Sequence, residues 1–176
     1  MNAEIVKTQM KDLKLSTAAR ELDEVLVRHR SAAALDWLSE LFEHELDARK
    51  ERSIARRIDG AGFPELKTLE EFDWAFNRKI ERSKVEELAK LDFVRQRRIA
   101  LLLGQTGTGK THVALALGLK AVKEGLHVYC ASVKRLAEEI QAALNKGALD
   151  VLFRRILAAE LWIIDDWGVV SMKREI

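Results

Sequence analysis

The spacing of apolar residues predicts helices over the first third of the chain. Between residues 16 and 58, apolar side chains recur every three or four positions, as Leu22, Val25 and Leu26 do. This is the period of an amphipathic helix. The only proline, Pro64, follows two closely spaced glycines and marks a boundary. We therefore predict a small all-helical domain over residues 1–62 and a second domain over residues 63–176.

The pattern changes in the second domain. Short, largely apolar runs predict strands, and patterns of helical period lie between them. A continuous apolar run is typical of a parallel strand covered on both faces. Alternating strands and helices indicate an α/β fold, a parallel sheet with helices on both faces. The predicted strands are residues 99–103, 126–130 and 161–164. The predicted helices are residues 109–123, a helix capped by Ser132 with Leu136, Ile140 and Leu144 inward, and a short helix over residues 151–157.

Two capping-box patterns precede this alternation. Thr68 is followed by Glu71, and Ser83 by Glu86. In such a box the hydroxyl and the carboxylate each accept a hydrogen bond from the other residue's backbone N–H. Each pair therefore predicts the start of a short helix. We also expect the helix over residues 109–123 to end in a left-handed cap at Gly125.

The composition limits the classes of protein to which this chain can belong. Apolar residues make up 48% and charged residues 33% of the 176 positions, which is typical of a globular chain. The single cysteine, Cys130, excludes a disulfide framework and a cysteine-based zinc site. No stretch approaches the ~20 apolar residues of a membrane span, and the N-terminus does not resemble a secretory signal. We expect a cytoplasmic protein without a membrane partner.

The strongest chemical signal is the sequence GQTGTGKT, which fits the P-loop pattern GxxxxGK[ST]. It follows an apolar run and opens a helix, so backbone N–H groups and the helix N-terminus would face phosphate oxygens. Lys110 would reach the terminal phosphates, and the Thr111 hydroxyl would bind Mg²⁺. The alternative is an accidental glycine-rich turn, which this context disfavours. The predicted ATP-binding residues are Gly104, Gln105, Thr106, Gly107, Thr108, Gly109, Lys110 and Thr111.

An acidic pair, Asp165 and Asp166, follows the third predicted strand. Open α/β sheets bind ligands at the carboxyl ends of their strands. Downstream of a P-loop, Asp165 is predicted to hold Mg²⁺ through water, and Asp166 to polarise an attacking water. Alone, such a pair is more often a solvated strand end.

Basic residues gather at the end of the first domain. Arg49, Arg52 and Arg56 share one helical face at three- and four-residue spacing. Such a stripe can neutralise the phosphates of nucleic acid. The alternative is a solvated helix face, with Glu51 pairing with nearby arginines. The candidate DNA-binding residues are Arg49, Lys50, Arg52, Arg56 and Arg57.

Taken together, the segments LDARKERSIARRI, FPELKTLEEFDW, LLLGQTGTGKTHVALALG and LWIIDDWG resemble the IstB family. These proteins are ATP-binding helpers of insertion-sequence transposition and are related to DnaC-type helicase loaders. His112, directly after the P-loop, is part of the resemblance. The resemblance implies an AAA+ P-loop ATPase fold preceded by a small helical DNA-binding domain. It also implies oligomerisation on double-stranded DNA and delivery of a target site to a partner transposase.

The sequence departs from that family at two points. Gln105 and Thr106 occupy positions where the family usually has two prolines, although neither position needs a side chain for phosphate contact. The chain also ends at Ile176, before the sensor and arginine-finger segments that the AAA+ resemblance implies. In that fold the next strand lies between the P-loop strand and the Asp165 strand.

We therefore expect a C-terminally truncated ATP-binding domain with a gap in its sheet, which binds ATP weakly and does not turn it over. Two alternatives to the transposition helper remain open at this point. One is a replication helicase loader, and the other is a catalytically inactive remnant that binds DNA or a transposase.

Overall fold

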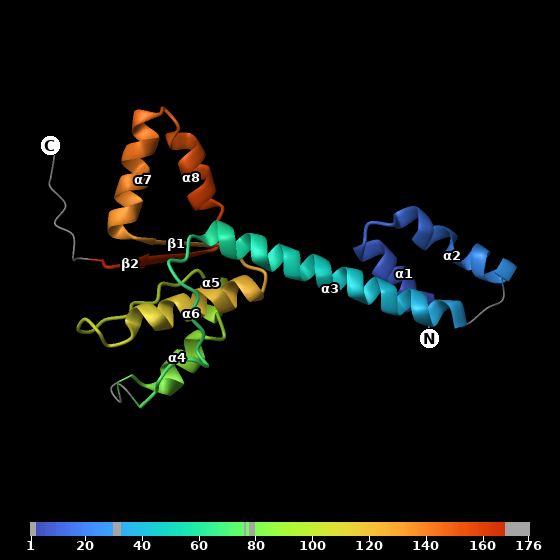
Figure 1. The fold of residues 1–176 in the computed structure, drawn as a ribbon, viewed down its shortest axis with the longest axis horizontal. Coiled ribbons are helices and arrows are strands. Elements are labelled where there is room, and N and C mark those ends of the chain that lie inside the picture. Colours follow the sequence, from blue (N-terminus) through green and yellow to red (C-terminus); the bar gives the residue numbers. More distant parts are fainter. Residues whose placement is uncertain (1–2, 30–32, 76, 78–79, 168–176) are drawn as a thin grey trace. The chain divides into compact units, whose positions relative to one another are not determined.

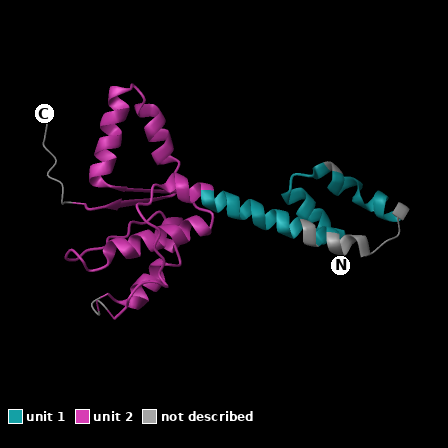
Figure 2. Ribbon diagram, in the orientation of Figure 1, with its two compact units in different colours: residues 1–55 teal, residues 56–176 magenta. Residues whose placement is uncertain are grey.

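The computed structural model describes residues 3–29, 33–75, 77 and 80–167. By its internal contacts the chain divides into two compact units, residues 1–55 and residues 56–176 (Figure 2). Each unit is described by itself below. None of the helices in the described part of the chain combines the length and apolar character that a membrane span requires.

The first unit is helical, as the apolar spacing predicts. It contains α1 (Ala3–Asp12), α2 (Ser16–His29) and most of α3 (Ala33–Ala61). Its core is formed by Val6, Met10, Ala19 and Leu22, with partly buried side chains of α2 and α3 against it. The sequence prediction began the helical region at residue 16 and missed α1. That helix has only three buried side chains, one of them the polar Gln9, so its apolar residues show no clear helical spacing.

A polar contact is buried in this core. The Ser39 hydroxyl donates to Oε1 of Gln9 at 2.9 Å, and the Gln9 amide donates to Glu43 at 3.2 Å. Ser39 is 1% exposed, and a buried hydroxyl without a partner is costly. This contact therefore favours one alignment of α1 against α3.

The second unit combines helices with a small parallel sheet (Figure 1). Strands β1 (Val128–Ser132) and β2 (Leu161–Asp165) pair in parallel, with Val128 opposite Leu161 and Ser132 opposite Asp165. The β2 prediction is confirmed, whereas β1 begins two residues later than expected and extends to Ser132. The helices of this unit are α4 (Arg82–Leu88), α5 (Asp92–Arg95), α6 (Lys110–Lys123), α7 (Val133–Asn145) and α8 (Leu149–Leu157).

Helices cover both faces of this sheet. On one face, Tyr129 and Ala131 of β1 pack with Leu152 and Ile156 of α8. On the opposite face lies α6, where Gly118 faces the tip of the Ile163 side chain. Successive strand residues point to opposite faces of the sheet. The apolar runs of β1 and β2 therefore provide apolar side chains to the helices on both faces. The expectation of a mixed parallel α/β unit is confirmed.

Helix boundaries follow the predicted caps closely at two helices. Ser132 accepts a hydrogen bond from the backbone N–H of Arg135 at 3.2 Å and so caps α7. Helix α6 ends at Lys123, and Gly125 follows its C-cap with a φ angle of 95°. The Leu126 N–H is bonded to the Ala121 carbonyl, the hydrogen bond of a Schellman motif. Of the side chains predicted to face inward on α7, Leu144 is instead half exposed.

The strand predicted at residues 99–103 does not form. Ile99, Leu101 and Leu103 are 86%, 76% and 86% exposed. Among the described residues the sheet consists of β1 and β2 alone, so this segment has no strand beside it. A strand satisfies its backbone groups only on a neighbouring strand. Apolar character alone therefore did not make residues 99–103 a strand.

The two capping boxes also differ from expectation. Thr68 and Glu71 exchange both hydrogen bonds, Thr68 N–H to Glu71 at 3.1 Å and Glu71 N–H to Thr68 at 3.3 Å. They close a turn rather than start a helix. Helix α4 begins at Arg82 with Glu81 as its N-cap. The short helix predicted at Ser83 is therefore confirmed, whereas Ser83 as its cap is wrong.

Candidate nucleotide-binding site

The P-loop motif forms a tight loop that leads directly into α6. Gly107 and Gly109 have φ angles of 78° and 90°, a conformation that glycine adopts without steric cost. Gly109 is the N-cap of α6, and no side-chain hydrogen bond caps this end of the helix. The first N–H groups of an α-helix have no partner inside the helix. This end of α6 therefore offers donors to an anion.

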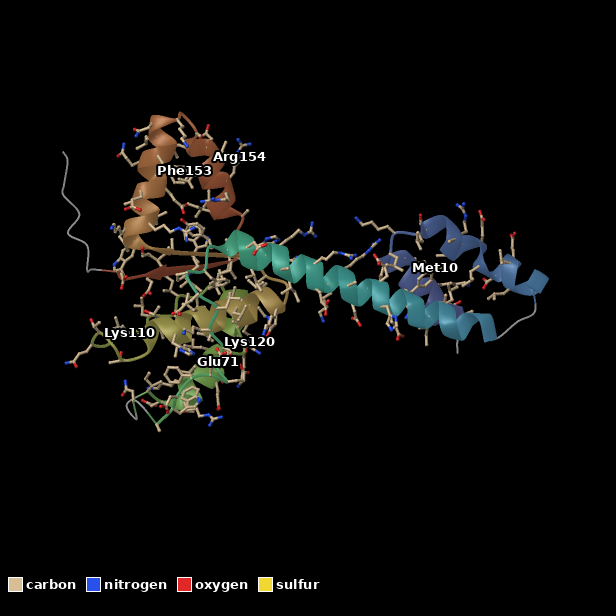
Figure 3. The ribbon with its side chains drawn as sticks, viewed as in Figure 1. Met10, Glu71, Lys110, Lys120, Phe153 and Arg154 are labelled. Carbon is tan, nitrogen blue, oxygen red and sulfur yellow. The ribbon has the colours of Figure 1, made fainter. Side chains whose placement is uncertain are left out.

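Lys110 folds back onto the loop that it follows. Its ammonium group donates to the Gln105 carbonyl at 2.7 Å and lies 3.5 Å from the Thr108 hydroxyl. The Thr108 hydroxyl donates to the same carbonyl at 2.8 Å. Figure 3 shows Lys110 at the loop end of α6. A positive charge therefore lies beside the backbone donors of the loop. Gln105 takes part in this contact through its carbonyl.

The acidic pair lies at the carboxyl end of β2, where the sequence predicted it. Asp165 is the last residue of the strand, and the Asp166 N–H donates to Oδ1 of Asp165 at 2.9 Å. Asp166 is exposed, with a φ angle of 56°. Among the described residues, no hydrogen bond joins the pair to Lys110 or Thr111. The structure thus places both parts of the predicted site without a direct contact between them.

Asp165 lies close to Cys130 of β1. Burial raises the pKa of the Cys130 thiol to about 11, and the charge of Asp165 adds to the rise. Cys130 is 2% exposed. A thiol with a raised pKa is a poor nucleophile, so Cys130 acts as a packing residue next to the carboxylate.

The five basic residues predicted to contact DNA all lie on α3. Glu45, rather than the predicted Glu51, pairs with two of them: Arg49 donates to its carboxylate at 2.7 Å and Arg52 at 3.3 Å. The hydrogen bond from Arg49 is the main reason that the pKa of Glu45 is lowered. Lys50 and Arg56 are exposed, and Arg57 is half-buried. Part of the positive charge on this helix is therefore already balanced.

The profile of the family described as IstB-like ATP binding protein matches residues 8–176. The chain belongs to this family. A relative from Pseudomonas aeruginosa, an ATP-binding protein of insertion sequence IS21, is 36% identical over 140 residues, which are 80% of this chain and 53% of the relative. An IS21-like ATP-binding protein of Bacteroides fragilis (strain YCH46) is 30% identical over 94% of this chain and 84% of the relative.

A third relative, the ATP-binding protein of insertion sequence IS232 from Bacillus thuringiensis subsp. berliner, is 26% identical over 96% of this chain and 68% of its own length. The chain spans about half the length of the Pseudomonas aeruginosa relative. The matched region includes the P-loop and the acidic pair of this chain.

Three side chains contact the P-loop region in ways that the sequence did not predict; for His112 it predicted only packing on its own helix. Asn77 donates from its amide to the Thr108 carbonyl at 3.3 Å. His112 lies 2.8 Å from the Thr68 carbonyl, and Phe72 packs against Gly109. Phe72 and His112 belong to the family motifs quoted above. That resemblance was the only sequence signal for their role.

Proposed function

We propose that this chain binds ATP with Mg²⁺ at its P-loop and serves as an ATP-dependent helper of DNA transposition, built on an AAA+ fold. The observation that carries the proposal is the uncapped N-terminus of α6, with the Lys110 ammonium folded beside it. Membership in the IstB-like family supports the nucleotide. The names of its relatives, which are ATP-binding proteins of insertion sequences, support transposition over helicase loading.

The residues at hand fit the nucleotide. Backbone N–H groups of residues 107–110 would donate hydrogen bonds to phosphate oxygens, and Lys110 would exchange its contact with the Gln105 carbonyl for one with a charged phosphate. The Thr111 hydroxyl and the Asp165 carboxylate are oxygen ligands of the kind that Mg²⁺ prefers. The metal, when bound, would neutralise charge on the phosphate oxygens. Asp166, exposed beside Asp165, is the proposed base that takes a proton from water.

For DNA we propose the basic residues of α3 as phosphate contacts. Arg49, Lys50, Arg52 and Arg56 are exposed, and arginine pairs well with phosphate. Glu45 would compete with DNA for Arg49 and Arg52. A partner transposase and assembly of several copies on DNA follow from the family resemblance and belong to the same proposal.

The nucleotide proposal is tested with Lys110→Ala. Loss of a charged contact to phosphate costs ~1.5–3 kcal/mol, or at least about tenfold in affinity. Binding of a fluorescent ATP analogue with Mg²⁺ should therefore weaken at least about tenfold. Lys146→Ala, at an exposed lysine after α7, is the matched control and should bind like the unsubstituted chain. Equal affinity of Lys110→Ala and that control would contradict the proposal.

The DNA proposal is tested by the salt dependence of duplex binding. Each neutralised phosphate contributes a slope of about −0.9 in log affinity against log salt. Replacing Arg52 and Arg56 together by alanine should flatten the slope by roughly two such contributions. Glu45→Gln should strengthen binding, because it releases Arg49 and Arg52. A slope that neither variant changes would assign these residues to a solvated helix face.

A further inference from the structure

His112 forms a hydrogen bond that reaches outside its own helix. It stands in the first turn of α6, directly after Thr111, and its Nε2 lies 2.8 Å from the carbonyl oxygen of Thr68. A carbonyl only accepts hydrogen bonds, so Nε2 carries the hydrogen and donates. The ring also meets Phe72 edge to face, with 5.1 Å between ring centroids and 78° between planes. His112 thus ties the Thr68 turn to the start of α6.

Phe72 fills the space beside the last glycine of the P-loop. It is 7% exposed, and a Cβ on Gly109 would lie 2.7 Å from its Cε2 atom. Real Cβ atoms do not approach a ring so closely, so the backbone at Gly109 rests directly on this ring. Asn77 adds a hydrogen bond to the preceding carbonyl, that of Thr108, at 3.3 Å.

The turn that carries these contacts is itself held closed. Thr68 and Glu71 exchange two hydrogen bonds, and Phe72 follows directly. Glu71 lies next to α6 in Figure 3. We call Thr68, Glu71, Phe72 and Asn77 the brace. It contacts Thr108, Gly109 and His112, on both sides of Lys110.

We propose that the brace holds the P-loop in its phosphate-binding shape, and that His112 is the positioning residue that fixes the brace on α6. This inference rests on the proposed nucleotide binding. Backbone donors that are already ordered bind an anion without a further ordering cost. The predicted ligand of the braced loop is thus the polyphosphate chain itself, whatever base is attached to it.

The test compares two probes, a fluorescent ATP analogue and inorganic tripolyphosphate, on three full-length variants. His112→Phe keeps a ring against Phe72 but removes the donor, His112→Gln keeps a donor, and His127→Phe changes an exposed histidine before β1. A neutral hydrogen bond corresponds to a change of about three- to tenfold. His112→Phe should weaken both probes equally by that factor. His112→Gln should restore most of the loss, and His127→Phe should change neither probe.

In the binding comparison, two results would overturn the inference. One is unchanged affinity of His112→Phe for both probes. The other is a loss for the ATP analogue alone, which would assign the segment to contact with the base. A merely structural role would be shown if His112→Phe and His112→Gln lost affinity together and both unfolded at a lower temperature than the unsubstituted chain.

Hydrogen exchange of the ligand-free chain separates this inference from the proposed function. The amides of residues 107–110 should exchange faster in His112→Phe than in the unsubstituted chain or in His127→Phe. If no variant binds either probe, nucleotide binding fails, yet faster exchange would still support the brace. Unchanged exchange at these amides would refute it.

Discussion

Residues 99–103 and α6 flank the same loop and are both rich in apolar side chains, yet their surroundings differ. Val113, Leu115 and Leu117 of α6 are buried, whereas Ile99, Leu101 and Leu103 are exposed. A helix satisfies its backbone hydrogen bonds within itself and needs only an apolar surface to lie against. A strand also needs a neighbouring backbone. The comparison teaches that apolar character determines burial only where the backbone is satisfied too.

The largest expected effect is on the helix side of this comparison. Leu115 is 1% exposed, so Leu115→Ala would leave a cavity in the packing of α6. Buried Leu→Ala changes cost ~2–5 kcal/mol. We expect a loss of stability in that range from urea unfolding followed by tryptophan fluorescence. A loss no larger than that of an exposed leucine would mean that α6 is not packed as described.

Gly118→Ala tests the contact between α6 and the sheet. A Cβ at this position would collide with Ile163 of β2 and with Phe63, and overpacking costs ~1–3 kcal/mol. We expect a loss in that range by the same unfolding measurement. Ile163→Val removes the colliding methyl group, so the double variant should lose less than the sum of the two single changes. Strict additivity would contradict the close approach.

The burial of Cys130 in β1 predicts a pH dependence of the stability of the chain. Burial raises the pKa of its thiol from an ordinary 9.0 to about 11. Below pH 9 the thiol is protonated in both states and its contribution to stability is complete. Between pH 9 and pH 11 the unfolded chain loses the proton first, so stability falls as pH rises.

Tyr129 has a raised pKa as well, chiefly through burial, so the comparison must be made against Cys130→Ala. That variant should lose less stability across this pH window, by ~1–2 kcal/mol. Thermal unfolding of both chains at a series of pH values measures the difference. Parallel pH profiles would show that Cys130 is accessible to solvent in the folded chain.

The smallest effect is expected at the other flank of the loop. Leu101 is 76% exposed, and exposed substitutions usually change stability by less than ~0.5 kcal/mol. Leu101→Ala should therefore unfold like the unsubstituted chain. Leu101→Lys should lower aggregation, because a charge interrupts an apolar segment of high β-propensity. A loss as large as that of Leu115→Ala would show that residues 99–103 are buried as a strand in solution.

The sequence by itself determined the parts of this protein whose signals are local. Ser132 caps α7 because its hydroxyl satisfies an N–H three residues away. Gly109 and Lys110 begin α6, and Asp165 ends β2, as their motifs predict. The IstB-like family follows from the same segments. In each case the interacting groups are close in sequence, so a short stretch of sequence includes both of the residues that interact.

Tertiary structure decided the features whose partners are distant in sequence. Whether residues 99–103 form a strand depends on a neighbouring backbone, which their own composition does not specify. The contacts of Phe72 with Gly109 and of His112 with Thr68 join segments that no periodicity connects. The pairing of Arg49 and Arg52 with Glu45 rather than Glu51 is an exception, because these partners are near in sequence and side-chain geometry on α3 decides between the two glutamates. Hydrogen bonds and packing are short-range in space, and the fold determines which groups come within that range.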